Sequence, residues 1–375
     1  MEPPMHISRL KLGDFRNYAR AELVLSSRHV VLTGHNGAGK TNLMEAVSLL
    51  SPGRGMRRAA YGDLVRSGAP GGFSVFAEVD GMEGPVEIGT GHNPQEDSGR
   101  QVRINGTPAR GADELLDHSR ILWLTPAMDG LFTGPAADRR RFLDRLVLSI
   151  DPAHGKRALD FERAMRSRNR LLAEGRTDRS WLDGLEAQMA ELGVAMLIAR
   201  RELVGLLTQL IDTQDQGSCF PRALLALEGF ESVAAIAGAG DAEAAYATAL
   251  EHGRGRDQAA GRTLEGPHRM DLAVSHRGKA IAAALCSTGE QKALMIGLIL
   301  AHAGLVRNLV RQPPLLLLDE IAAHLDAERR VALFDLIDEL GGQAFMTGTD
   351  RSLFEALDER GQFLDVQDGL VTPLS

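Results

Sequence analysis

The sequence predicts an α/β fold with a mostly helical second lobe, and three observations lead to this expectation. Short apolar stretches suited to β-strands occupy the first 35 residues, and the one at 29–33 runs directly into a glycine-rich loop. Long leucine- and arginine-rich stretches with helical spacing fill 139–211. Alternating helices and strands then return. We therefore expect a first lobe built from 1–130 and 263–375, interrupted by a helical second lobe at 131–262.

Composition limits the class of protein. The 375 residues are 44% hydrophobic, 25% charged and 5% aromatic, as in soluble globular proteins. We find no apolar run that approaches bilayer-spanning length and no signal segment, so we expect a cytoplasmic protein without a membrane partner. Cys219 and Cys286 are the only cysteines, which excludes a disulfide framework or a cysteine-rich zinc site.

Charge is distributed unevenly along the chain. The net charge of −8 argues against a protein that coats nucleic acid. The segment 137–179 differs, because it holds 12 Lys and Arg against 7 Asp and Glu. Within it Arg163, Arg166 and Arg170 recur at helical spacing. Two interpretations remain open here: a solvated helix face, or a surface that binds phosphates.

The elements follow in order along the chain. We expect a strand at 6–12, where Ile7, Leu10 and Leu12 alternate with polar residues, a strand at 29–33, and a helix over 42–50. Residues 72–105 resemble a meander of short strands that ends in the turn Asn105-Gly106.

Helices are expected next, at 139–150, 154–172 and 181–211, without the sustained heptads of a long coiled-coil arm. The polar, glycine-rich stretch 253–266 is expected to be a boundary, followed by a hairpin around Arg277-Gly278. Helix, strand, helix and strand then complete the chain.

The glycine-rich loop fits the phosphate-binding pattern G-x-x-x-x-G-K-[ST] at every fixed position. Glycines let successive backbone N–H groups point at phosphate oxygens, and the following helix adds its positive end. Lys40 would place its charge on the β- and γ-phosphates of ATP, and the Thr41 hydroxyl would hold Mg²⁺. A chance glycine-rich turn is the alternative, but the preceding strand and following helix favour a nucleotide site. The expected nucleotide-binding residues are Gly34, His35, Asn36, Gly37, Ala38, Gly39, Lys40 and Thr41.

Four leucines at 315–318 precede Asp319 and Glu320. Such a run indicates a buried parallel strand with its carboxylates at the carboxyl end, where ligands of such sheets lie. Asp319 would hold the water shell of Mg²⁺, as a Walker-B aspartate does. Glu320 would orient or deprotonate the attacking water, so Glu320 and Lys40 are the expected catalytic residues.

The segment 286–292, here called the signature segment, opens a helix. Ser287 and Glu290 fit a capping box, which is a sufficient structural role by itself. The segment also lies 32 residues before Asp319, the order found in ATP-binding-cassette (ABC) proteins. In that class a Ser-x-Gly segment of one subunit closes over the γ-phosphate bound by the other. Ser287 and Gly289 would then form an anion site in trans, which makes dimerisation dependent on ATP.

The spacing of these motifs discriminates within the class. Lys40 and Ser287 are 247 residues apart, far more than a transporter ATPase needs, and the helical lobe accounts for the excess. After the acidic pair, Leu325-Asp326 resembles the D-loop of ABC proteins. The predicted fold class is therefore α/β, an ABC-type P-loop ATPase head with a mostly helical second lobe.

In combination, these segments resemble the RecF family of bacterial DNA-repair ATPases, whose heads are related to those of SMC and Rad50 proteins. The resemblance runs nearly end to end. The segments that carry it are LKLGDFRNY at 10–18, LTP at 124–126, GP at 134–135, RRRFLD at 139–144 and GPHRMDL at 266–272.

The resemblance implies an ATP-dependent homodimer that binds DNA at single-strand gaps and junctions. It implies that the RecO and RecR proteins are partners in loading the RecA recombinase, during replication restart and the SOS response. It also implies weak, slow hydrolysis of ATP, used as a release switch. Two alternatives stay open: an SMC/Rad50-type head for chromosome structure, against which the missing coiled-coil arms argue, and the ATPase subunit of a transporter.

Several positions depart from the wider ABC class. Thr125-Pro126 stands where SMC proteins carry the Q-loop glutamine. No histidine occupies the switch position near the end of the chain, for which Thr347 and Thr349 are the candidates. For His268-Arg269 a packing role is favoured over a chemical one.

Overall fold

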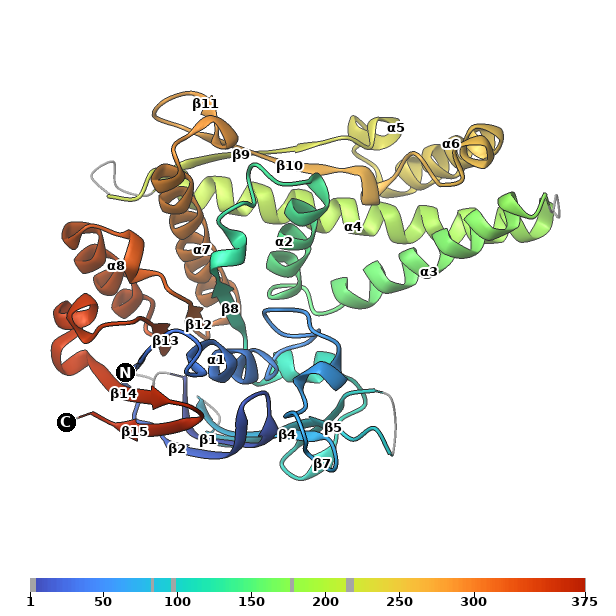
Figure 1. The fold of residues 1–375 in the computed structure, drawn as a ribbon. Coiled ribbons are helices and arrows are strands. Elements are labelled where there is room, and N and C mark those ends of the chain that lie inside the picture. Colours follow the sequence, from blue (N-terminus) through green and yellow to red (C-terminus); the bar gives the residue numbers. More distant parts are fainter. Residues whose placement is uncertain (1–4, 82–83, 96–98, 176–178, 214–218, 375) are drawn as a thin grey trace. The chain divides into compact units, whose positions relative to one another are not determined.

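The computed structural model describes residues 5–81, 84–95, 99–175, 179–213 and 219–374 (Figure 1). Contacts divide the chain into two compact units. The first unit comprises Met1–Asp129, Asp215–Pro221 and Ser287–Ser375, and the second comprises Gly130–Gln214 and Arg222–Cys286. The last stretch of the second unit thus ends at Cys286, whereas the sequence predicted the end of the helical lobe at 262.

One layer of the first unit is an antiparallel sheet with the strand order β2-β1-β4-β5-β6-β7. A bulge between Ile7 and Arg9 shifts the register of β1, so that Ile7 and Leu10 are both buried although they are three residues apart. The predicted turn at Asn105-Gly106 is present, with φ values of 49° and 76°. The strands are β1 (His6–Phe15), β2 (Tyr18–Val24), β4 (Phe73–Gly81), β5 (Gly84–His92), β6 (Gln101–Ile104) and β7 (Thr107–Pro108).

The second sheet of this unit is mostly parallel, with the order β15-β14-β3-β13-β12-β8. Only β15 pairs antiparallel, at the edge. Every residue of β3, β8, β12 and β13 is buried, which explains the unbroken leucine run predicted to be a strand. Because these strands are parallel, their carboxyl ends meet at one edge of the sheet. The strands are β3 (His29–Thr33), β8 (Ile121–Leu124), β12 (Leu315–Leu318), β13 (Ala344–Thr347), β14 (Gly361–Gln367) and β15 (Leu370–Pro373).

Three helices accompany these sheets: α1 (Lys40–Ser48), α7 (Thr288–Val310) and α8 (Ala327–Leu340). Helix α7 has the length and apolar composition to cross a membrane, which corrects the expectation that no run approaches that length. Its apolar stretch is 67% buried inside the protein, as in a core helix. Short 3₁₀ segments complete the unit: η1 (Tyr61–Leu64), η2 (Ala112–Asp117), η3 (Pro126–Met128), η6 (Ala322–His324) and η7 (Arg351–Arg360).

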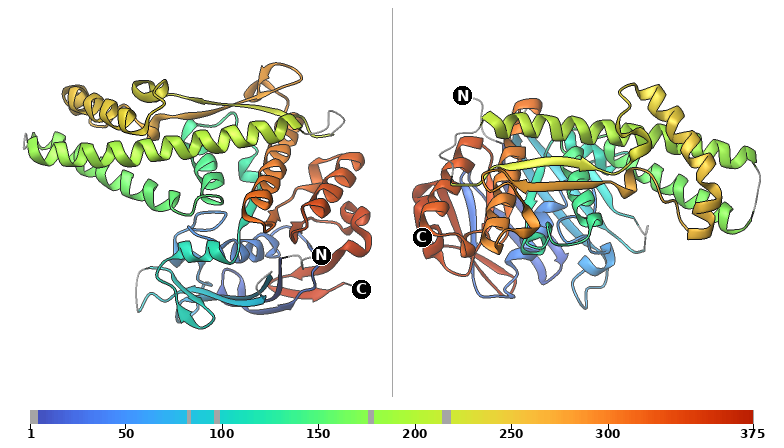
Figure 2. Two further views of the ribbon diagram at one scale, coloured as in Figure 1. Left: turned by 180° about the vertical axis from the view of Figure 1, so that it is seen from behind. Right: turned by 90° about the horizontal axis from the view of Figure 1, so that it is seen from above.

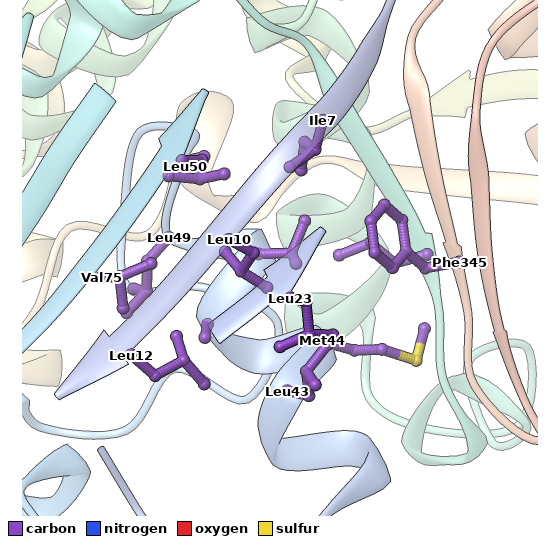
Figure 3. Close-up of a cluster of buried hydrophobic side chains, with 14 of the residues drawn as sticks. Ile7, Leu10, Leu12, Leu23, Leu43, Met44, Leu49, Leu50, Val75 and Phe345 are labelled. Atoms are coloured by element: carbon purple, nitrogen blue, oxygen red, sulfur yellow. The ribbon is translucent and has the colours of Figure 1, made fainter. Parts of the chain in front are cut away.

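Hydrophobic side chains join the antiparallel sheet to α1 (Figure 3). Ile7, Leu10 and Leu12 of β1 lie in one cluster with Leu43 and Met44 of α1, and each is at most 3% exposed. Burying a side chain of this size stabilises the fold by about 1.5–3 kcal/mol. This packing fixes α1, and with it the glycine loop from which the helix starts.

The second unit combines helices with a small antiparallel sheet of order β11-β10-β9. Helices α3 and α4 lie side by side as a hairpin (Figures 1 and 2). The three helices predicted for this lobe are confirmed to within three residues at each end. The elements are α2 (Ala136–Leu148), α3 (His154–Ala173), α4 (Arg179–Thr213), β9 (Ala223–Glu228), α5 (Glu231–Ala234), α6 (Ala239–Ala260), η4 (Pro267–Arg269), β10 (Asp271–His276), β11 (Ile281–Ala282) and η5 (Ala283–Leu285).

A fully buried arginine connects three of these helices. Arg168 of α3 donates from Nε to Oε1 of Glu186 on α4 at 2.8 Å, and from Nη1 to Oδ2 of Asp257 on α6 at 2.7 Å. Its Nη2 donates to the backbone carbonyl of Leu250 at 2.7 Å. Every polar group of this cluster is paired, which is the condition for burying charge at low cost.

Helix α6 corrects the prediction that 253–266 is a glycine-rich boundary. Glycine in a helix costs up to about 1 kcal/mol, which favoured a loop. However, Tyr246, Leu250 and Asp257 are buried on one face, and Asp257 binds Arg168, so tertiary contacts outweigh that cost. The strand β10 then pairs with β9, an element the sequence did not predict, and this pairing keeps 271–276 in the second unit.

Candidate nucleotide-binding site

The glycine loop connects β3 to α1, as the sequence predicts. Gly34 and Gly39 have φ values of 142° and 117°, which only glycine adopts without strain. A Cβ at Gly34 would lie 2.3 Å from the carbonyl oxygen of Val366, and one at Gly39 would lie 2.5 Å from Nδ2 of Asn17. The loop therefore has no room for side chains at these two positions, and its backbone is held closely by its neighbours.

Lys40 folds back over the loop. Its Nζ donates to the carbonyl oxygens of Gly34 at 2.6 Å and His35 at 2.8 Å. Burial lowers the pKa of Lys40, while the nearby carboxylates of Glu320 and Asp319 act in the opposite direction. The ammonium group thus lies within the curl of the loop, where a P-loop lysine meets phosphate oxygens.

The remaining loop residues divide by exposure. His35, Asn36 and Gly37 are exposed, whereas Ala38 is buried. The ring of His35 lies 3.5 Å from the carboxylate of Asp368 in the turn between β14 and β15. The outer half of the loop is therefore accessible to a ligand, while its inner half packs against the protein.

The structure brings the two predicted metal-binding residues together. Asp319 follows β12 and is only 4% exposed. Thr41, at the start of α1, donates its hydroxyl hydrogen to Oδ1 of Asp319 at 3.0 Å. The two residues are far apart in the sequence, and they meet because β3 and β12 end at the same edge of the parallel sheet.

Glu320, the predicted general base, follows directly. Its φ of 54° is unusual for a residue with a side chain, and its N–H donates to the hydroxyl of Thr347 at 2.8 Å. Thr347 also donates to Oδ1 of Asp319 at 2.7 Å. Of the two candidates for the switch position, Thr347 is therefore buried against the acidic pair, whereas Thr349 is exposed.

These residues fit ATP and Mg²⁺. The N-cap of α1 is Gly39, which has no side chain, so the first N–H groups of the helix are left to an anionic ligand. The hydroxyl of Thr41 and the carboxylate of Asp319 are the hard oxygen ligands that Mg²⁺ prefers. Among the described residues no group of three or more His, Cys, Asp and Glu could hold a metal by itself.

Two residues that support the loop were not assigned a role from the sequence. Tyr18 is fully buried, and its hydroxyl donates to the carbonyl oxygen of Gly39 at 3.0 Å. Asn17 donates from Nδ2 to the carbonyl oxygen of Ala38 at 3.0 Å and accepts from Nδ2 of Asn42 at 2.8 Å. Asn17 lies in the turn between β1 and β2, and Tyr18 is the first residue of β2. Both belong to the segment 10–18 that carries the family resemblance, but nothing in the sequence pointed to these contacts.

The signature segment caps α7. Ser287 is the N-cap: its hydroxyl accepts from the N–H of Glu290 at 3.4 Å, and its own N–H donates to the Glu290 carboxylate at 3.0 Å. Ser287 and Gly289 are both exposed. No hydrogen bond or ion pair among the described residues links Ser287 to the phosphate loop of its own chain. Asp326, in the segment that resembles a D-loop, likewise caps α8 by accepting from the N–H of Arg329 at 2.8 Å.

In the second unit, side-chain hydrogen bonds connect the segments 139–144 and 266–272. Arg139 makes a bidentate pair with Asp271, at 2.8 and 2.7 Å, and Arg140 donates to the carbonyl oxygen of Met270 at 2.7 Å. His268 bonds to the carbonyl oxygen of Thr263 at 3.0 Å, and burial lowers its pKa. These contacts explain the two segments as packing elements.

The sequence is similar over nearly its whole length to proteins of one family. A model of the RecF/RecN/SMC N-terminal domain matches residues 6–372. The DNA replication and repair protein RecF of Rhizobium etli (strain CIAT 652) is 66% identical over 372 residues, covering 99% of this chain and 100% of that protein. The chain belongs to the RecF family. RecF of Rhizobium rhizogenes is 67% identical over 373 residues, with the same coverage.

Solved structures agree with the RecF fold. A structure of the recombination mediator protein RecF-ATPrS in the RecFOR pathway has a TM-score of 0.89 at 22% identity and covers 100% of this chain and 99% of that chain. An Smc head domain from Pyrococcus furiosus has a TM-score of 0.54 at 18% identity, covering 99% of this chain and 96% of that chain. The predicted α/β head and the RecF resemblance are both confirmed. The alternatives of a chromosome-structure head or a transporter subunit are set aside, because the full-length relatives are RecF proteins.

Proposed function

We propose that this RecF-family chain is an ATP-switched DNA-binding protein of recombinational repair and replication restart. The observation that carries the proposal is the cluster of Lys40, Thr41, Asp319 and Glu320 at one edge of the parallel sheet. Family membership supports the link to DNA replication and repair, because the relatives carry that name.

In this proposal the loop 34–41 binds the phosphates of ATP through its N–H groups and Lys40. Thr41 and Asp319 hold Mg²⁺, which supplies positive charge against the phosphate oxygens during hydrolysis. Glu320 orients the attacking water and accepts its proton. A solved relative named RecF-ATP supports the choice of nucleotide.

The second part of the proposal is a homodimer held together by ATP. Ser287 and Gly289 of one protomer would close over the γ-phosphate bound by the partner, making the site complete only in the dimer. Their exposure supports this, because both residues are accessible to a partner protomer. ATP would then hold the two protomers together, and its slow hydrolysis would let them dissociate.

DNA binding is proposed for the α3 stripe, defined as Lys156, Arg163, Arg166 and Arg170, all exposed on helix α3. Lys156, Arg163 and Arg170 follow at seven-residue intervals, about 10.5 Å apart along a helix. Arg163 pairs with Asp160 and Arg166 with Glu162, but such exposed pairs are worth at most about 1 kcal/mol. Phosphates can therefore compete for these side chains, as DNA binding by this face requires.

Family membership further suggests gapped or junction DNA as the substrate, RecO and RecR as partners, help in loading RecA, and the cytoplasm as the location. A solved relative is described as a mediator in the RecFOR pathway, which supports the choice of partners.

The test measures binding to gapped and duplex DNA over a salt series, with and without ATP and Mg²⁺, for the wild type and Lys40→Ala. ATP should strengthen gapped-DNA binding by the wild type, and Lys40→Ala should lose most of that gain because the loop lacks its cation. Equal binding by both proteins, whether or not ATP is present, would refute the ATP switch.

A further inference from the structure

We propose that Thr347 is the positioning residue that holds Asp319 and Glu320 in the geometry needed for ATP hydrolysis. The inference rests on the proposed ATPase site and adds a residue to it. Thr347 ends β13, between β3 and β12 in the parallel sheet, and is fully buried. It therefore lies between the strand that leads to the phosphate loop and the strand that leads to the acidic pair.

Both bonding functions of the Thr347 hydroxyl are used on the acidic pair. A threonine hydroxyl has one hydrogen to donate and oxygen lone pairs that accept. The hydrogen goes to Oδ1 of Asp319 at 2.7 Å, and the oxygen accepts the N–H of Glu320 at 2.8 Å. One side chain thus fixes a metal ligand and the backbone of the general base together.

The carboxylate of Asp319 is held by two hydroxyls on the same oxygen. Thr41 donates to Oδ1 at 3.0 Å from α1, and Thr347 donates at 2.7 Å from β13. The carboxylate cannot rotate without losing both bonds. This restraint sets the orientation in which Asp319 meets Mg²⁺, as partners of metal ligands do in other sites.

Glu320 needs a restraint of its own. Its φ of 54° places a residue with a Cβ in the left-handed region, where the backbone is strained and persists only if its surroundings hold it. The bond from its N–H to Thr347 supplies such a hold. Without that bond the chain after β12 can relax, and the carboxylate of Glu320 moves with it.

The same hydrogen bonds exclude Thr347 from acting as the sensor of the γ-phosphate. A sensor must donate a hydrogen to a phosphate oxygen, and the only hydroxyl hydrogen of Thr347 is bound to Asp319. Thr349 is exposed and is the position left for that role.

The test compares Thr347→Val, Thr347→Ser and Thr90→Val. Thr90 is a matched control, because it is 5% exposed and its hydroxyl also has two partners. The hydroxyl donates to the carbonyl oxygen of Gln101 at 3.0 Å and accepts from Nε of Arg100 at 2.7 Å. It lies on β5 of the antiparallel sheet, away from the acidic pair. Each protein is measured for kcat at saturating ATP, for the Mg²⁺ concentration that gives half-maximal rate, and for binding of a fluorescent ATP analogue in EDTA.

We expect Thr347→Val to lower kcat and raise its Mg²⁺ requirement, with the combined loss about 10- to 100-fold. Analogue binding in EDTA should stay near the wild-type value, because the phosphate loop is untouched. Thr347→Ser should restore most of the rate, and Thr90→Val should keep it. A Thr347→Val protein with wild-type kcat and Mg²⁺ requirement overturns the inference, and so does a serine variant as impaired as the valine variant. A wild type that binds no analogue would instead refute the proposed function.

Discussion

Removing one oxygen atom, by Tyr18→Phe, tests whether the start of β2 holds the phosphate loop in its binding conformation. The ring of Tyr18 is fully buried and stays in place as phenylalanine. The loss is the 3.0 Å bond from the tyrosine hydroxyl to the carbonyl oxygen of Gly39, the residue before Lys40. Burial raises the pKa of Tyr18, so its hydroxyl is protonated and able to donate throughout the physiological range.

The magnitude follows from the loss of one of two hydrogen bonds, because the carbonyl oxygen of Gly39 also accepts the N–H of Leu43 at 3.0 Å and keeps that partner. Losing an ordinary hydrogen bond costs about 0.5–1.5 kcal/mol. If this cost falls on the loop conformation that binds nucleotide, the apparent Kd for ATP rises by about 2- to 13-fold, since affinity scales with the competent fraction.

Tyr246→Phe is the matched control. Tyr246 is also fully buried, and its hydroxyl donates to the carbonyl oxygen of Glu265 at the same distance of 3.0 Å, but in the second unit. Titration of a fluorescent ATP analogue against both variants and the wild type is the assay. We expect weaker binding only for Tyr18→Phe. Wild-type affinity of Tyr18→Phe, or an equal loss in Tyr246→Phe, would refute the reasoning.

Two further predictions concern the second unit. Arg168→Met should lower the free energy of unfolding of the second unit in urea by about 3–5 kcal/mol, because buried carboxylates lose their partner. Arg166→Met, at an exposed position, should cost at most about 1 kcal/mol. Similar urea midpoints of unfolding for the two variants would contradict this. Replacing Arg163 and Arg170 together by glutamine should reduce the slope of log K against log salt for duplex DNA by about two. Arg179→Gln, at another exposed cation of this unit, should leave the slope unchanged, and an unchanged slope in the double variant would remove the α3 stripe as the DNA surface.

Local patterns predicted the part of the site that lies within short stretches of chain. The loop 34–41 carries its own conformational requirements in its glycines, and four leucines are enough to place Asp319 at the end of a buried strand. The lengths of α2, α3 and α4 followed from apolar spacing. The outline of the fold was therefore accessible to sequence reasoning, and so were the segments proposed to hold phosphate and metal.

Contacts between distant segments were not accessible. The bond between Thr347 and Asp319 depends on β13 lying beside β12, and strand order cannot be read from the strands themselves. The bond from Tyr18 to Gly39 depends on the start of β2 lying beside the phosphate loop, which the segment 10–18 alone does not reveal. In α6 the glycines favoured a loop, and only the burial of Asp257 against Arg168 explains why the helix continues.

The central claim is that ATP joins two copies of the chain through Ser287. Sedimentation velocity with ATP and Mg²⁺ tests it most directly, on the wild type and on Ser287→Arg, with ATP binding measured in parallel. We predict that the wild type shifts from monomer to dimer, and that Ser287→Arg binds ATP but stays a monomer, because the arginine side chain fills the space of the γ-phosphate contact. A Ser287→Arg protein that still dimerises with ATP would contradict the account.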